Sequence, residues 1–519
     1  MSVLQALGRA EAVAGGRAVP AATVLHRRLT EQPLVLVLLT TAGEAGAPLA
    51  AMAGTDREAP RLLVVPQPLD RDLRFGFFGE LADVLLPLLE SYGERTETEP
   101  ATRNREETEL CADALQIVVP NGATVDYVRL VGRSTRFLRT ADDPDAPYPV
   151  PAPLPLLGRW LTHYAERART PGSSLLLAMT DLLSRHWTTG QSALEDQHLG
   201  ALLGWIDPPP GTDGAAAAAR TETGRSPGGL LVSPPAGPAT DPRFDNRVLA
   251  PALARYDAAR AAGSGVAAAE AEVRRLVESQ LRPVWDDVWH GLDLLRALPV
   301  GAHVDDRWKR DRWSFTGHRD RVRAGEPPQP RRDDAIAAAQ KLAGRETAQA
   351  RLAAQEALDD PLAMAARRLA GEAFTGVVRA VAEGFSEGRR PMPRPLVTVG
   401  TADLPQAEPG ARLYRAVPEG RSAQPAEFVS AEAADDAQDP AGGCLITVRL
   451  TGGMGNGRVP REGSVPVPGD LVTFTLFEHD ARGGPALPDP EATPWTHGGP
   501  PDAAAVPDAP DPVTPEDHL

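Results

Sequence analysis

The stretch between Cys444 and His479 constrains the fold of this chain most strongly. Apolar and polar residues alternate along Cys444–Leu450 (CLITVRL) and again along Leu471–Phe477 (LVTFTLF), which is the period of half-buried strands. The glycine-rich segment Gly452–Gly457 lies between them, and we interpret it as a hairpin tip because glycine tolerates the positive φ of tight turns. The sequence therefore predicts a small β-barrel-like domain over residues 396–479. Its other strand patterns are Leu396–Val399 and Arg412–Arg415.

Continuous apolar runs dominate the first part of the chain. The strongest are Pro33–Thr40, Arg61–Val65 and Leu115–Val119, and such runs suit strands that are buried on both faces of a sheet. Helical patterns alternate with them, which favours a covered and at least partly parallel sheet. From Leu157 onward the pattern is wholly helical. We therefore expect an α/β domain with C-terminal helices over residues 1–206.

The remaining segments differ in composition. Residues 207–243 are rich in proline, glycine and small side chains, and we predict a flexible, disordered linker there. Residues 244–395 predict a helical arm region, which ends with helices at Asp333–Leu358 and Leu362–Phe385. The acidic, proline-rich residues 480–519 predict a disordered tail. The expected fold class is thus multidomain α/β + α + β.

Charge and cysteine usage limit the class of protein. The formal net charge is −16, which argues against a surface coated in nucleic acid but leaves room for a local basic groove. Cys111 and Cys444 lie far apart, which favours a reducing cytoplasm over a disulfide framework. The N-terminus lacks the apolar run of a signal peptide, and no apolar run is long enough to cross a bilayer. We expect a cytoplasmic protein that is not associated with a membrane.

The sequence matches parts of some short catalytic motifs, but the surrounding residues do not provide the structure that each motif requires. Lys309 and Lys341 are the only lysines, and the chain has no P-loop pattern. Gly384–Gly388 fits G-x-S-x-G, but it closes a predicted helix rather than joining a strand to a helix. His318-Arg319-Asp320 lacks the asparagine of a kinase loop. H-E-x-x-H and C-x-x-C do not occur. We expect no cofactor and no metal, and the sequence leans away from an enzyme.

Asp305–Arg323 (DDRWKRDRWSFTGHRDRVR) is the strongest candidate for a functional surface. Seven Lys or Arg and four Asp residues are interleaved with aromatic residues. Arginines that pair with phosphates beside aromatics that stack on bases are typical of single-strand binding. The same pattern fits tryptophans anchored in a core, or a protein interface. The residues predicted to contact a partner are Arg307, Trp308, Arg310, Arg312, Trp313 and Arg319.

The C-terminal half resembles the stalk-and-barrel accessory region of some superfamily 1 helicases. The resemblance covers the predicted arm Asp333–Phe385 and the strands Cys444–Leu450 and Leu471–Phe477. Because the chain has no P-loop, the resemblance implies a protein that associates with a separate motor ATPase. Our first hypothesis is a non-enzymatic cytoplasmic accessory or scaffold protein, whose helical arm and β module contact a partner protein or nucleic acid.

The second hypothesis is an enzyme with its site in the N-terminal domain. Asn121-Gly122 follows the strand Leu115–Val119 and leads into a helix that begins near Thr124. Helix amide groups at the end of a strand bind anions. Asp126 and Arg129 would be the nearby polar groups. An ordinary strand-to-helix turn explains the same residues.

Overall fold

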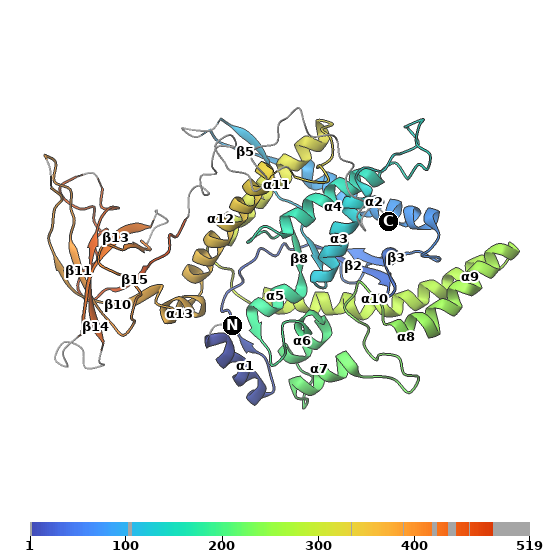
Figure 1. Ribbon diagram of the computed structural model, residues 1–519, viewed down its shortest axis with the longest axis horizontal. Coiled ribbons are helices and arrows are strands. Elements are labelled where there is room, and N and C mark those ends of the chain that lie inside the picture. Colours follow the sequence, from blue (N-terminus) through green and yellow to red (C-terminus); the bar gives the residue numbers. More distant parts are fainter. Residues whose placement is uncertain are drawn as a thin grey trace, which may run out of the picture. The chain divides into compact units, whose positions relative to one another are not determined.

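The computed structural model describes residues 3–101, 106–333, 335–387, 389–417, 423–433, 443–455 and 457–480. The chain divides into two compact units, Gln5–Ala339 and Gln340–Ala486, of which the second is described as far as Asp480. The first unit contains a mixed sheet with helices, and the second contains a closed β-barrel. The expected multidomain α/β, α and β architecture is confirmed (Figure 1).

A five-stranded sheet forms the centre of the first unit, with strand order β4-β3-β2-β7-β8. β2, β7 and β8 run parallel, whereas β3 and β4 are antiparallel to their neighbours. This confirms the partly parallel sheet, and three of its strands lie where the apolar runs predict them. The bounds are β2 (Leu34–Thr41), β3 (Glu44–Gly54), β4 (Arg61–Val64), β7 (Ile117–Val119) and β8 (Leu176–Ala178).

Helices cover both faces of this sheet (Figure 1). Leu34, Leu36 and Leu38 belong to the core on the side of α2, α3 and α4. Val35 and Val37 belong to the core on the side of α5, α6 and α10. Every one of these residues is buried, so the run is apolar throughout rather than alternating. The bounds are α2 (Arg71–Glu94), α3 (Gly122–Thr135), α4 (Leu154–Ala168), α5 (Met179–His186), α6 (Leu199–Ile206) and α10 (Val266–Arg296).

The described residues up to 323 form several further elements. Ser192 and Glu195 form a capping box: the Ser192 amide donates to Glu195 Oε2 over 2.6 Å, and the Glu195 amide donates to Ser192 Oγ over 3.3 Å. The motif opens a 3₁₀ turn. The elements are α1 (Val3–Gly15), β1 (Val19–Pro20), β5 (Thr96–Glu99), β6 (Thr108–Cys111), β9 (Trp187–Thr188), η1 (Glu195–Gln197), α7 (Gly214–Thr223), α8 (Pro242–Phe244), η2 (Asp245–Leu249), α9 (Ala250–Ala262) and α11 (Val304–Arg323).

The predicted linker at 207–243 is folded, which corrects the sequence prediction. Its alanine run forms α7, where Ala217 and Ala218 are buried. Ala218 packs with Trp205 of α6, because small side chains allow two helices to approach closely. Ala236 belongs to the sheet core. The predicted domain boundary is therefore absent here, and the helices from 244 to 323 belong to the first unit.

A closed six-stranded barrel forms the second unit, in the order β10-β11-β14-β13-β12-β15. Burial alternates along β14 as the sequence predicts. Phe374 and Phe474 stack inside it with ring centroids 5.4 Å apart. The bounds are β10 (Ala373–Ala382), β11 (Leu396–Thr401), β12 (Arg412–Arg415), β13 (Gln424–Ala433), β14 (Cys444–Leu450) and β15 (Leu471–Thr475), preceded in the chain by α12 (Ala335–Asp359) and α13 (Pro361–Leu369).

Two expectations about the second unit are wrong. The predicted helix Leu362–Phe385 ends at Leu369, and Ala373–Ala382 is the first barrel strand. Its β-branched residues and inward-facing Phe374 fit a pleated strand better than a helix. Gly452–Gly457 is not a hairpin tip, because β14 pairs with β11 and β13 whereas β15 pairs with β10 and β12. The predicted tail beyond residue 480 lies outside the described residues.

The contact between α3 and α4 gives a test of this packing. A Cβ added at Gly158 would lie 2.5 Å from the Arg136 amide nitrogen and 2.5 Å from Thr135 Oγ1. We expect Gly158→Ala to lower the free energy of unfolding by about 1–3 kcal/mol. Gly317 of α11 is the control, because a Cβ there meets no described atom within 4 Å. Gly317→Ala should stabilise by up to about 1 kcal/mol. Urea unfolding measures both, and equal effects would contradict the packing described.

Candidate functional site

Helix α11 carries all six predicted contact residues, and three of them point into the first unit. Arg307 and Arg319 are 5% and 6% exposed. The Arg307 guanidinium donates to the His26 carbonyl over 3.0 Å, and Arg319 Nη1 donates to the Gly93 carbonyl over 2.7 Å. Trp308 Nε1 donates to Asp113 Oδ1 over 2.9 Å. These side chains attach the helix to the segments around the sheet.

The other three predicted residues are less buried. Arg312 Nε donates to the Cys111 carbonyl over 3.0 Å, and its guanidinium pairs with Glu97. Trp313 is half-buried and Arg310 is exposed. The alternative that the sequence left open, tryptophans anchored in a core, therefore describes Trp308. Arg307, Arg312 and Arg319 anchor the helix as well, which the sequence did not predict. Contact with a partner stays a prediction for Arg310 and Trp313.

A buried carboxylate on the same helix was missed by the sequence analysis. The Asp311 side chain is fully buried and accepts from Arg167 Nη2 over 2.7 Å. It also accepts from Ser173 Oγ over 2.7 Å and from the Ser174 amide over 2.6 Å. A buried charge persists only when it is paired and hydrogen-bonded. Asp311 therefore holds α11 against α4 and the turn that leads into β8.

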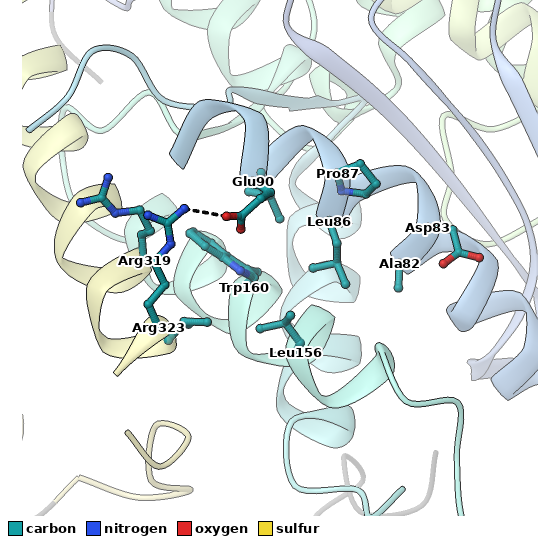
Figure 2. Close-up of a pocket in the computed structure, with 11 residues that line it drawn as sticks. Ala82, Asp83, Leu86, Pro87, Glu90, Leu156, Trp160, Arg319 and Arg323 are labelled. Carbon is teal, nitrogen blue, oxygen red and sulfur yellow. Dashed lines mark hydrogen bonds and ion pairs between the residues drawn. The ribbon is translucent and has the colours of Figure 1, made fainter. Parts of the chain in front are cut away.

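A pocket of about 340 Å³ opens where α2, α4 and α11 meet (Figure 2). Trp160, Leu156 and Leu86 form its apolar part. Figure 2 shows Glu90 and Arg323 meeting at one end and Asp83 lying at the other. The lining residues are Ala82, Asp83, Leu86, Pro87, Leu89, Glu90, Leu156, Trp160, Arg319, Val322 and Arg323.

An ion pair marks one end of this pocket. Arg323 Nη2 lies 2.6 Å from Glu90 Oε1, and the two side chains are 44% and 59% exposed. A pair this exposed contributes about 0–1 kcal/mol, so another carboxylate can replace Glu90 at low cost. On the wall of the pocket, Pro87 has no amide hydrogen and cannot donate to the carbonyl of Asp83 within α2.

Two stacked histidines lie behind Trp160. The rings of His163 and His318 are 4.3 Å apart and 7° from parallel, and the edge of Trp160 meets His318 with centroids 4.6 Å apart. His163 Nε2 and both ring nitrogens of His318 have no hydrogen-bond partner among the residues that the structure describes. Burial, with smaller contributions from Arg321 and Arg159, lowers the pKa of His318 to about 3. Burial, then His318, holds the pKa of His163 well below its ordinary value.

The strand-to-helix turn of the second hypothesis is filled by the chain itself. Asn121 is 6% exposed and caps α3 by accepting from the Thr124 amide over 3.0 Å. Its Nδ2 donates to the Gly237 carbonyl over 2.8 Å. The Gly122 amide, which would bind an anion, donates to Gln197 Oε1 over 3.3 Å. Of the two polar groups expected near this turn, Asp126 is exposed and Arg129 is half-buried.

Comparisons with known proteins add no assignment. Protein-family models, curated proteins and solved structures gave no match to this chain. Within the described residues, no three His, Cys, Asp or Glu side chains are grouped so as to hold a metal ion. None of the helices in those parts of the chain is both long and apolar enough to cross a membrane. Cys111 and Cys444 are each buried and free.

The sequence held part of the signal for this pocket. Each of the three helices contributes residues four positions apart: Leu86 with Glu90, Leu156 with Trp160, and Arg319 with Arg323. That spacing places both members on one helix face. Only Arg319 was among the predicted residues, because nothing in the sequence states that these three faces meet.

The buried histidines predict a loss of stability in acid. His318 stays neutral in the folded protein down to about pH 3, but in the unfolded chain it is protonated below about pH 6.5. Between these values only the unfolded state gains the proton. The free energy of unfolding therefore falls, as pH drops below 6.5, by up to about 1.4 kcal/mol per pH unit for this residue.

We expect His318→Gln to remove this contribution. Urea unfolding of both proteins at about pH 7.5 and 5.5 should show that the variant loses about 1 kcal/mol less than the wild type. Circular dichroism at the higher pH checks that the variant folds. An equal loss in both proteins would mean that His318 is protonated in the folded state.

Proposed function

We propose that this protein acts by binding, as an accessory protein whose pocket between α2, α4 and α11 receives an apolar side chain of a partner polypeptide. The observation that carries the proposal is an apolar pocket that ends in an exposed, exchangeable ion pair. This makes the first unit a docking module. The partner is defined by its chemistry: a large apolar residue close to a carboxylate.

The size and lining of the pocket favour a single large side chain. About 340 Å³ is at the lower end of the roughly 300–1,000 Å³ of ligand sites. Trp160, Leu156 and Leu86 supply apolar contact. Burying a Leu, Phe or Met side chain contributes about 1.5–3 kcal/mol, which suits a reversible contact reinforced by neighbouring interactions.

The ion pair supplies orientation. A carboxylate of the partner can take the place of Glu90 on Arg323, and guanidinium groups bind carboxylates through two parallel hydrogen bonds. Leu86 and Glu90 lie one helical turn apart on α2. A partner helix with an apolar and an acidic residue at a similar spacing matches both ends of the pocket.

Binding explains the site better than catalysis does. Near the pocket, the histidines with strongly lowered pKa values, His163 and His318, are 7% and 2% exposed and lie behind Trp160. A general acid or base must reach the proton that it transfers. At the other candidate position, Gln197 already occupies the Gly122 amide. The enzyme hypothesis therefore has no supporting geometry at either place.

Selection from a random peptide library displayed on phage tests the proposal. We expect enriched peptides to share a large apolar residue and an Asp or Glu three or four positions away. Leu86→Arg places a charge in the pocket. It should weaken the affinity for the most enriched peptide by more than about tenfold, as measured by fluorescence anisotropy.

Leu194→Arg is the matched control, because Leu194 is 83% exposed and does not line the pocket. It should bind the peptide like the wild type. Peptides that bind the Leu86→Arg protein as tightly as the wild type would place recognition elsewhere and refute the proposal.

A further inference from the structure

An exposed aromatic ring in the second unit lies beside an arginine. Phe385, in the segment between β10 and β11, is 45% exposed. The Arg458 guanidinium, from the loop that joins β14 and β15, lies 5.6 Å from the ring centroid. The loops at this edge of the barrel thus present a half-exposed ring stacked on a cation, an arrangement that is stable in water.

Backbone hydrogen bonds fold the segment around Phe385 into a short hairpin. The Arg394 amide donates to the Gly384 carbonyl over 2.7 Å, and the Ser386 amide donates to the Met392 carbonyl over 2.8 Å. Ser386 Oγ accepts from the Met392 amide over 2.9 Å. Phe385 and Pro393 are opposite each other in an isolated bridge. The backbone on either side of the ring is therefore held by pairing with residues 392–394.

Positive charge gathers on the same two segments. Arg389 and Arg390 are exposed near the end of the hairpin, and Arg394 lies on its returning side. Arg458 and Arg461 are exposed on the second loop. The acidic residues of these segments are Glu383, Glu387, Glu462 and Asp470. Five arginines against four carboxylates leave a local excess of one positive charge in a chain whose formal charge is −16.

We propose that this surface, formed by Phe385, Arg389, Arg390, Arg394 and Arg458, binds single-stranded nucleic acid. A base stacks on the exposed ring of Phe385, and the arginines contact the neighbouring phosphates. An acidic peptide would pair with the arginines, but its carboxylate side chains cannot cover the ring, whereas every nucleotide of a strand carries a planar base. The exposed ring therefore favours a nucleic-acid strand over an acidic polypeptide.

Anisotropy of a fluorescent oligothymidine of about 20 nucleotides, titrated with the full chain at about 50 mM salt, tests this proposal. Phe385→Ala should weaken binding by about tenfold. Phe385→Leu should weaken it similarly, because leucine keeps the apolar bulk but cannot stack. Arg458→Gln should reduce the slope of log affinity against log salt by about 0.7, the value for one phosphate contact on a single strand.

Arg412→Gln is the matched control, because it removes a guanidinium that lies 5.8 Å from the Tyr414 ring on β12. It should leave affinity and slope unchanged. The proposal is overturned if the wild type does not bind the oligonucleotide, if Phe385→Leu binds as tightly as the wild type, or if polyglutamate competes equally well. Leu86→Arg should bind the oligonucleotide normally, which separates this site from the pocket of the first unit.

Discussion

The buried carboxylate of Asp311 is the constraint on which the architecture of the first unit depends. Its side chain is fully buried and is bound by Arg167, Ser173 and the Ser174 amide. Such a buried charge needs several donors, and α4 and the turn before β8 supply three of them when α11 lies against both. Once α11 is fixed, Arg319 and Arg323 stand beside Trp160 and Glu90, and the pocket follows from their meeting.

Similar residue types serve opposite purposes in the two units. On α11, Arg307, Arg312 and Arg319 turn inward, where backbone carbonyls at His26, Cys111 and Gly93 accept their hydrogen bonds. Trp308 also turns inward and donates to the Asp113 carboxylate. On the barrel loops, Phe385, Arg389, Arg390 and Arg458 are exposed, and Arg394 is half-buried. A mixture of arginine and aromatic residues therefore does not by itself define a binding surface. Whether such arginines are buried or exposed depends on whether backbone carbonyls of other segments lie close enough to accept their hydrogen bonds. The fold determines that, not the local sequence.

Patterns with a short period were predicted well, and those that depend on distant segments were not. Strands β2 and β7 could be predicted because they are continuous apolar runs, and β14 because its buried and half-buried residues alternate. β3 was missed because its alanines and glycine carry little strand signal, although Ala50, Ala51 and Ala53 are fully buried. β8 was missed because its three apolar residues run directly into a helix. For the pocket, the sequence shows that the lining residues of each helix are spaced four positions apart. It does not show that the three helices pack against one another.

The most direct test of this account is the free energy of unfolding of Asp311→Ala, measured in urea beside Asp306→Ala. Asp306 is an exposed carboxylate in the first turn of the same helix, and its loss should change stability by no more than about 1 kcal/mol. Removing Asp311 leaves Arg167 without its buried partner and should cost about 3–5 kcal/mol. A loss no larger than that of Asp306→Ala would contradict the claim that this carboxylate holds α11, and with it the pocket, in place.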